Sequence, residues 1–302
     1  MAGTAKTRRA NNAQAKVAAL RAEQAARRRR TQLATTAVIA IVAVIAALVT
    51  VKLVNGSHTV GGSGTTGSAS PAVVKALTSV PLSTYDSVGT GGIPPAFTSL
   101  PSGTPALVKD GKPRVLYAGA EYCPFCAAER WALATALSRF GTFTNLGTTA
   151  SAGGQEYAPN TATLSFHGAT YTSKYLVFNG YELQSNKVVG NAYTILDTPP
   201  AADEAVIQKY DGPPYLTKNG AIPFIDYGGK VVSQGTAYDP LLLQGMTRLQ
   251  IAQAMSDPTS KAGKAIIGTA NLITAQLCKL TGNQPGSVCT SAGVTAAANA
   301  LG

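Results

Sequence analysis

The longest run of apolar positions lies near the start of the chain. Residues 33–51 contain no charged side chain and, apart from threonine, no polar one. A helix of that length spans roughly 28 Å, the thickness of the hydrocarbon core of a bilayer. A cleaved signal peptide is the alternative, but its apolar region is usually shorter and ends at a small-residue cleavage site, whereas Lys52 and a polar segment follow here. The pattern predicts one uncleaved transmembrane helix within residues 31–54.

Beyond this span the pattern changes to that of a linker and then of a folded domain. Residues 55–70 are rich in Gly, Ser and Thr and have no apolar periodicity, which is typical of a flexible tether. Prolines bound a predicted short helix at residues 71–81. Asp110-Gly111 predicts a turn that leads into a buried strand over residues 114–120.

The remaining positions predict helices and strands in alternation. Residues 127–140 contain no Gly or Pro and place apolar side chains on one helical face, and Gly141 then predicts the end of the helix. Short strand-like runs follow between residues 143 and 198, and residues 199–210 predict a helix with acids in its first turn. A strand, a Gly-Gly turn and a second strand are predicted for residues 221–238, and about three helical segments for residues 246–302. The fold class is therefore α/β, in one domain over residues 71–302.

The net charge of +11 is concentrated before the apolar run. Residues 1–30 hold nine Lys or Arg against one Glu, a net +8, whereas residues 55–302 hold 15 against 13, a net +2. By the positive-inside rule the basic tail is cytoplasmic and the domain extracytoplasmic. The tail is interpreted as a topology determinant and solvated arm; contact with anionic lipid headgroups or nucleic acid is the alternative. Because the domain is nearly neutral, no nucleic-acid partner is expected.

The segment GAEYCPFCAAERW places Cys123 and Cys126 where the predicted strand meets the predicted helix. Such a pair could be a redox dithiol, half of a zinc site or a structural disulfide. Zinc requires four ligands in tetrahedral geometry, and a copper-delivery site would need a His or Met beside the motif. The other candidate zinc ligands do not have zinc-ribbon spacing: Cys278, Cys289, His58 and His167. Neither a metal nor another cofactor is expected.

The redox interpretation accounts for more of the neighbouring residues. Pro124 falls in the first helical turn, where it breaks no hydrogen bond, and Cys123 becomes the helix N-cap. Free N–H groups and the positive end of the helix dipole favour a thiolate there, which lowers the thiol pKa from about 8.5 into roughly 3.5–7.5. An exposed Cys123 is then the nucleophile and a sheltered Cys126 the resolving thiol.

AEYCPFC after an apolar strand and before a helix resembles the active site of the thioredoxin superfamily, and its Cys-Pro-aromatic-Cys form is similar to glutaredoxins. The resemblance implies a thioredoxin-like fold over residues 106–142 and 215–257, and a cis-proline that faces the dithiol. Ile222-Pro223 matches that cis-proline pattern, an ordinary proline at a strand start being the alternative. An insert at about residues 143–214 then separates the two halves. The larger secreted oxidases that resemble disulfide-bond protein A have a helical insert, whereas the sequence of this insert predicts β-strands in part of it.

The whole chain, with its basic tail, anchor, CPFC and C-terminal cysteine pair, is most similar to a bacterial and archaeal membrane family known only as domain of unknown function 929. Residues 246–302 then form a helical C-terminal extension. Cys278 and Cys289 are interpreted as a structural disulfide across a short Gly/Pro loop, and a second redox relay is the alternative. Family membership bears on the fold more than on the reaction.

Several side chains near the dithiol are candidates for tuning it. Glu121 could relay protons, oppose the thiolate by like charge or be simply solvated. Tyr122 and Phe125 could form an apolar rim for an unfolded substrate, or only pack at the surface. Because Phe125 cannot donate a hydrogen bond to the thiolate, we expect a couple less oxidising than the strongest secreted oxidases, and a higher potential for Phe125→His. Trp131 is assigned to packing, and no catalytic role is assigned to His167.

These features favour a membrane-tethered thiol-disulfide oxidoreductase that acts on exported proteins. Cys123 and Cys126 exchange disulfides, Pro223 shapes the groove beside them, and a separate redox partner completes turnover. The alternative is a binding or envelope-scaffold protein in which CPFC is a permanent disulfide. A third interpretation is an electron conduit to another extracytoplasmic reductase.

Overall fold

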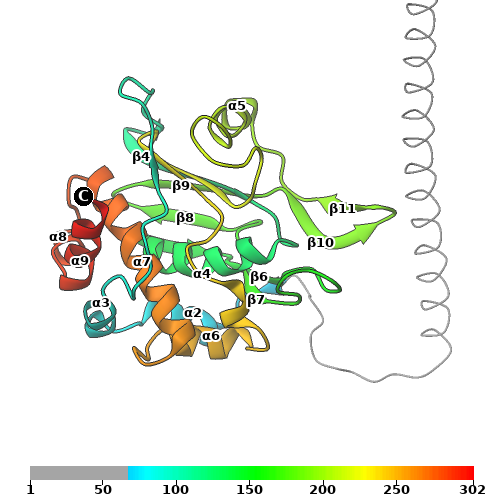
Figure 1. Ribbon diagram of the computed structural model, residues 1–302, viewed down its shortest axis with the longest axis horizontal. Helices are drawn as coiled ribbons and strands as arrows, with labels where there is room; N and C mark the ends of the chain where they lie inside the picture. The colour runs from blue at the N-terminus through cyan, green and yellow to red at the C-terminus, as the bar shows by residue number, and fades with distance from the viewer. Residues whose placement is uncertain (1–66) are drawn as a thin grey trace, which may run out of the picture. The chain divides into compact units, whose positions relative to one another are not determined.

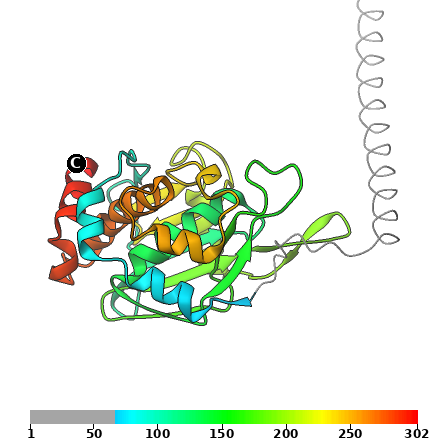
Figure 2. The same ribbon diagram turned by 90° about the horizontal axis from the view of Figure 1, so that it is seen from below.

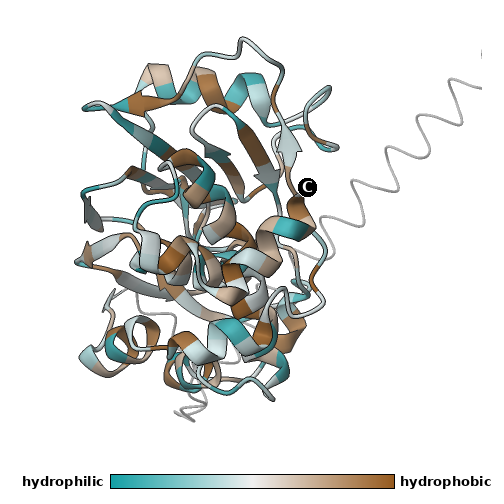
Figure 3. Ribbon diagram, turned by 90° about the vertical axis from the view of Figure 1, so that its left-hand side faces the viewer, coloured by the Kyte–Doolittle hydropathy of each residue, from teal (hydrophilic) through white to brown (hydrophobic). Residues whose placement is uncertain are grey.

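The computed structural model describes residues 67–302 and gives them a mixed α/β fold (Figure 1). The predicted cytoplasmic tail, the predicted transmembrane helix and most of the predicted linker lie outside the described residues. Hydrophobic and hydrophilic residues are interspersed along the helices (Figure 3). Within residues 67–302, none of the helices combines the length and the hydropathy needed to cross a bilayer.

A six-stranded sheet forms the centre of the domain. Its strands follow the order β2, β13, β12, β4 and β3, and β9 also pairs with β4. The β4–β9 pair is parallel and the other pairs are antiparallel. The six strands are β2 (Thr98–Ser99), β3 (Val108–Lys109), β4 (Lys112–Gly119), β9 (Val177–Glu182), β12 (Phe224–Tyr227) and β13 (Val231–Gln234).

The predicted hairpin into the buried strand is confirmed by β3 and β4. Asp110 and Gly111 both have positive φ, 52° and 72°, as the two central residues of a type I′ hairpin turn require. Beyond the turn, residues 115–118 of β4 have no solvent exposure. The strand is apolar on both faces because both faces of the sheet are covered by helices.

Helices cover the two faces of this sheet unequally. On one face α4 (Pro124–Ser138) and α7 (Lys261–Leu280) pack against each other and over Val115 and Tyr117. On the other, α5 (Ala201–Tyr210) forms a smaller apolar cluster that includes Ala118 and Phe224. Because β4 contributes to both clusters, the end of β4 is held firmly between the layers.

The remaining helices pack around α4 and α7 (Figures 1 and 2). The 3-10 helix η1 and the capping box of α6, in which Thr247 and Gln250 bond each other's backbone, fix the approach to α7. The C-terminal region contains four α-helices rather than the predicted three segments, because a short turn of helix separates α7 from the last helix. These elements are α2 (Pro71–Thr78), α3 (Leu82–Val88), η1 (Pro240–Leu243), α6 (Arg248–Ala254), α8 (Gly286–Cys289) and α9 (Ala292–Leu301).

The region expected as an insert is rich in β structure, but part of it belongs to the central sheet. Strand β9 lies within that range and pairs with β4, and the helix predicted at its end is α5. The other strands form small antiparallel sheets, of which the β10–β11 hairpin projects from the body of the domain (Figures 1 and 2). These strands are β1 (Gly67–Ser68), β5 (Gly141–Thr144), β6 (Gly147–Ala150), β7 (Ala162–Ser165), β8 (Thr170–Ser173), β10 (Gln184–Val189) and β11 (Ala192–Ile195).

Candidate functional site

The two cysteines of CPFC lie where β4 ends and α4 begins. Cys123 is the N-cap of α4, and its Sγ accepts a hydrogen bond of 3.3 Å from the backbone N–H of Cys126. Pro124 follows in the first turn, as predicted. The Cys123 Sγ also donates to the backbone oxygen of Ile222 at 3.6 Å, and the Ile222–Pro223 peptide bond is cis. The fold thus brings together two predicted segments that are far apart in sequence.

The environments of the two thiols shift their pKa values in opposite directions. The side-chain hydrogen bond from Cys126 is the main cause that lowers the pKa of Cys123, with help from the Cys126 N–H and the Arg130 charge, while desolvation opposes them. Burial raises the pKa of Cys126 well above its ordinary value, and the adjacent Cys123 raises it further. As the pH rises, a thiolate therefore forms on Cys123 before it forms on Cys126. This order suits a nucleophilic Cys123 and a resolving Cys126.

Cys123 is more buried than the sequence suggested. Its exposed fraction is 5%, and that of Cys126 is 0%, so the expectation of an exposed nucleophile is wrong in this conformation. The reason is that the Cys123 thiol turns toward the Ile222 carbonyl rather than toward solvent. Access to the sulfur then depends on the groups at the rim of the site.

Two aromatic stacks lie at that rim. Tyr122 stacks on Tyr193 of β11 with ring centroids 4.1 Å apart, and Phe125 stacks on Tyr157 at 5.9 Å. Phe125 and Tyr157 are 41% and 54% exposed. The Tyr157 hydroxyl donates to Asp239 at 3.2 Å. Tyr157 and Tyr193 were missed from the sequence, since no motif joins them to CPFC.

A buried ion pair lies beside the dithiol. Arg130 Nε and Nη2 donate to the two carboxylate oxygens of Glu182, at 2.7 and 2.6 Å, and both side chains are fully buried. Arg130 Nη2 also donates to the Ala120 oxygen at 2.6 Å. The Arg130 charge lowers the pKa of Cys123. Sequence reasoning missed this pair, although Arg130 lies one helical turn after Cys126 and therefore on the same face.

Three other residues discussed in the sequence analysis contact side chains or backbone elsewhere in the fold. Glu121 is fully buried and accepts a hydrogen bond of 2.8 Å from Ser165 Oγ, so the alternative of a solvated Glu121 is wrong. The Glu121 backbone N–H donates to Gln184 of β10, and this contact holds the residue inside the fold. Trp131 is fully buried and donates to the Ala162 oxygen, which confirms its packing role. His167 pairs with Asp197 at 2.7 Å in a partly exposed contact.

Cys278 and Cys289 form a disulfide, as predicted. Their Cα atoms are 5.6 Å apart, and the bridge joins the end of α7 to α8. It lies in the helical C-terminal region, at the side of the domain that carries α8 and α9 (Figure 1).

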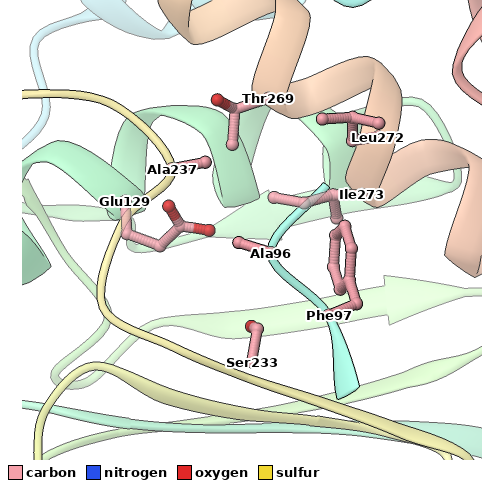
Figure 4. Close-up of a pocket in the computed structure, with 8 residues that line it drawn as sticks. All are labelled: Ala96, Phe97, Glu129, Ser233, Ala237, Thr269, Leu272 and Ile273. Carbon is pink, nitrogen blue, oxygen red and sulfur yellow. The ribbon is translucent and has the colours of Figure 1, made fainter. Parts of the chain in front are cut away.

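A small cavity between α4 and α7 is lined mostly by apolar side chains, together with three buried polar ones (Figure 4). The Glu129 carboxyl group points into this space of about 20 Å³, which Thr269 and Ser233 also line. Within residues 67–302, Glu129 Oε2 and Thr269 Oγ1 have no hydrogen-bond partner. Burial raises the pKa of Glu129 to about 8, against a smaller lowering by the Thr236 side chain, so the group is mostly protonated at neutral pH. The cavity is large enough for one water molecule.

Neither the curated proteins nor the solved structures contain a match to this sequence. In residues 67–302, no cluster of three or more His, Cys, Asp or Glu is arranged to hold a metal ion. One family model matches residues 103–279, more than half of the chain, and this range contains β4, both CPFC cysteines and Pro223. The chain therefore belongs to the family described as a domain of unknown function, DUF929.

Proposed function

We propose that this protein is a thiol-disulfide oxidoreductase whose reactive pair is Cys123 and Cys126. The observation that carries this function is the asymmetry of the pair: one thiol at a helix N-cap with a lowered pKa, the other fully buried with a raised one. A permanent structural disulfide has no need of that difference. Exchange chemistry does need it, because a thiolate must form before a second thiol can resolve the product.

The arrangement of elements around the pair supports a thioredoxin-like fold. Strands β9, β4, β12 and β13 are adjacent in that order, with β9 parallel to β4 and the next two pairs antiparallel. Helix α4 follows β4, and α7 comes after β13. This strand order, and the cis Ile222–Pro223 bond just before β12, support the thioredoxin-like fold that the resemblance implies. The β1–β3, β5–β8 and β10–β11 strands are then additions to it.

The exchange reaction uses only these two sulfurs and a protein substrate. In the reducing direction, the Cys123 thiolate attacks a substrate disulfide, forms a mixed disulfide and releases one substrate thiolate, which takes a proton from solvent. Cys126 then loses its proton and attacks Cys123 Sγ, which releases the second substrate thiolate and leaves Cys123–Cys126 oxidised. The oxidising direction is the reverse. In either case two electrons pass, and an external redox partner restores the starting state.

The proposed site of action is the outer face of a cell membrane. The predicted span at residues 31–54 and the basic residues before it support a single-pass anchor with a cytoplasmic N-terminus. An oxidising compartment also agrees with the Cys278–Cys289 disulfide. Substrates are then thiols or disulfides of exported proteins.

One observation favours the scaffold alternative, in which CPFC is a fixed staple. Cys123 is only 5% exposed, and a substrate disulfide must reach its sulfur. In that interpretation the aromatic rim at Tyr122 and Phe125 is ordinary surface packing.

A redox titration with mass-spectrometric detection of each alkylated cysteine distinguishes the two functions. A midpoint between roughly −120 and −270 mV for Cys123–Cys126 is expected of a catalytic pair, and a value below about −300 mV would identify a structural bridge. A second test is trapping: Cys126→Ser retains the nucleophile without the resolving thiol and should accumulate mixed disulfides with exported proteins. The matched control, Cys123→Ser, should trap none.

A further inference from the structure

Tyr117 carries a buried hydroxyl group without a hydrogen bond. Its side chain extends from β4 into the core beneath α4 and has no solvent exposure. Among residues 67–302, Tyr117 Oη has no hydrogen-bond partner. A buried hydroxyl of this kind costs free energy that phenylalanine, the same ring without the oxygen, would avoid. A partner that appears in another chemical state of the site would remove this cost.

The surrounding residues hold this hydroxyl beside the segment that leads to the dithiol. An edge contact with Phe166, at 5.0 Å between ring centroids, orients the Tyr117 ring. The hydroxyl lies against Gly119, where the Cβ of any other residue would overlap it. The oxygen of the next residue, Ala120, accepts a hydrogen bond of 2.6 Å from Arg130 Nη2. The Tyr117 hydroxyl and the Arg130 guanidinium therefore lie at adjacent residues of the same backbone segment.

The charges of the dithiol act on the Tyr117 hydroxyl. Burial is the main cause that raises the pKa of Tyr117 well above its ordinary value. Arg130 opposes this shift, whereas Cys126, Glu182 and Cys123 add to it, and of the two thiols Cys126 has the larger effect. The hydroxyl therefore keeps its proton at neutral pH and is available as a hydrogen-bond donor, not as a base.

The resolving step needs a thiolate on Cys126, and burial opposes that thiolate. Burial raises the pKa of Cys126 well above its ordinary value, Cys123 raises it further, and Arg130 and the Ala120 backbone act against the shift. In a mixed disulfide Cys123 carries no charge, but the burial of Cys126 remains. A hydrogen bond from a neutral donor favours the thiolate without adding another buried charge.

We propose that the Tyr117 hydroxyl donates a hydrogen bond to the Cys126 sulfur when that thiol ionises to resolve a mixed disulfide. The Cys126 thiolate then attacks Cys123 Sγ, the bond from Cys123 to the substrate sulfur breaks, and the substrate leaves as a thiolate. Solvent takes the proton lost from Cys126 and supplies one to the departing thiolate. This inference rests on the proposed thiol-disulfide exchange and assigns Tyr117 to the second of its two steps.

A disulfide with coloured products separates the two steps. Dithiobis(nitrobenzoate) releases one coloured thiolate when Cys123 attacks it and a second when Cys126 resolves the mixed disulfide, and stopped-flow absorbance follows both. The experiment uses the full-length chain in detergent with an equimolar amount of reagent. Cys123 and Cys126 are reduced beforehand while Cys278–Cys289 stays oxidised, as mass spectrometry of the alkylated protein verifies.

Tyr117→Phe removes the hydroxyl and keeps the ring. The matched control is Tyr227→Phe, which removes the hydroxyl of another tyrosine that is 1% exposed. Tyr227 pairs with Val115, two residues further along β4 from the dithiol than Tyr117, and its hydroxyl accepts from Ser233 Oγ at 3.5 Å. Both variants lose one buried oxygen from the same core.

Tyr117→Phe should release the first thiolate at the natural rate and the second about 10- to 100-fold more slowly at neutral pH, as expected for the loss of a hydrogen bond to a charged sulfur. The pH midpoint of the second release should rise by about one to two units. The other titratable groups around Cys126 are unchanged in the variant: Cys123, held in the mixed disulfide, Arg130, Glu182 and Glu121. Tyr227→Phe should match the natural sequence in both steps.

A second release at the natural rate from Tyr117→Phe would overturn the role of Tyr117 and leave the exchange function standing. Equal slowing by the two variants would assign the effect to core packing and would also overturn it. The reduced Tyr117→Phe chain should unfold at about the same denaturant concentration as the natural chain, because it loses no hydrogen bond; clear destabilisation would contradict the unpartnered hydroxyl. If the natural chain releases no first thiolate, the proposed oxidoreductase function fails together with this inference.

Discussion

Replacing Glu129 by glutamine should change how the stability of the domain depends on pH. Burial raises the pKa of this carboxyl group from its ordinary 4.5 to about 8 in the folded protein. A group with a raised pKa binds its proton more tightly in the folded state, so its contribution to stability is complete below about pH 4.5 and is lost as the pH rises toward 8. Between about pH 4.5 and 7 the loss is about 3 kcal/mol, at about 1.4 kcal/mol per pH unit.

Chemical denaturation of the compact unit Gly62–Gly302 measures this effect. Glu129→Gln keeps the shape of the side chain and cannot ionise. The free energy of unfolding of the variant, minus that of the natural sequence, should therefore increase by about 1.4 kcal/mol per pH unit between about pH 5 and 7. Asp211 and Asp226, whose pKa values burial raises to about 6, titrate in both proteins and cancel in the difference. Any constant effect of the glutamine amide on the cavity alters the offset and not the slope.

A flat difference between the two proteins would refute this reasoning. It would mean that the Glu129 carboxyl group is ionised at neutral pH in the folded state, with partners that compensate its burial. The control is Glu204→Gln on the exposed face of α5, which leaves Glu129 and its cavity unchanged and should therefore retain the pH dependence that Glu129 contributes.

Two further substitutions probe the dithiol and the C-terminal disulfide. Arg130→Met removes a buried charge that lowers the pKa of Cys123, so the pH at which Cys123 reacts half-maximally with iodoacetamide should rise; an unchanged midpoint in the folded variant would exclude Arg130 as a tuning group. Replacing Cys278 and Cys289 together by serine opens a short loop, and on the chain-entropy model the domain should lose about 3 kcal/mol of unfolding free energy. If that variant is as stable as the natural chain but loses electron transfer to Cys123, the pair is a relay rather than a structural bridge.

Local signals in the sequence were enough to locate the segment of the proposed dithiol. Asp110-Gly111 predicted a hairpin because few residue pairs adopt two positive φ angles readily, and CPFC predicted a helix start because proline suits the first turn. The disulfide between Cys278 and Cys289 was predicted from their short separation. Each of these features depends on residues close together in the chain.

The resemblance to thioredoxins implied that Ile222-Pro223 faces the dithiol, and Cys123 contacts the Ile222 carbonyl across 99 residues. Tertiary structure alone decided the charged surroundings of the dithiol, in which Arg130 meets Glu182 across 52 residues. Helical periodicity indicates that Arg130 faces inward but not which strand supplies its counter-ion, because that depends on how the layers pack. The same limit explains why the sequence left a solvated Glu121 open as one alternative, whereas the side chain is buried in the fold. Short-range backbone preferences determine elements, whereas burial, charge pairing and access to sulfur are set by contacts between elements distant in the chain.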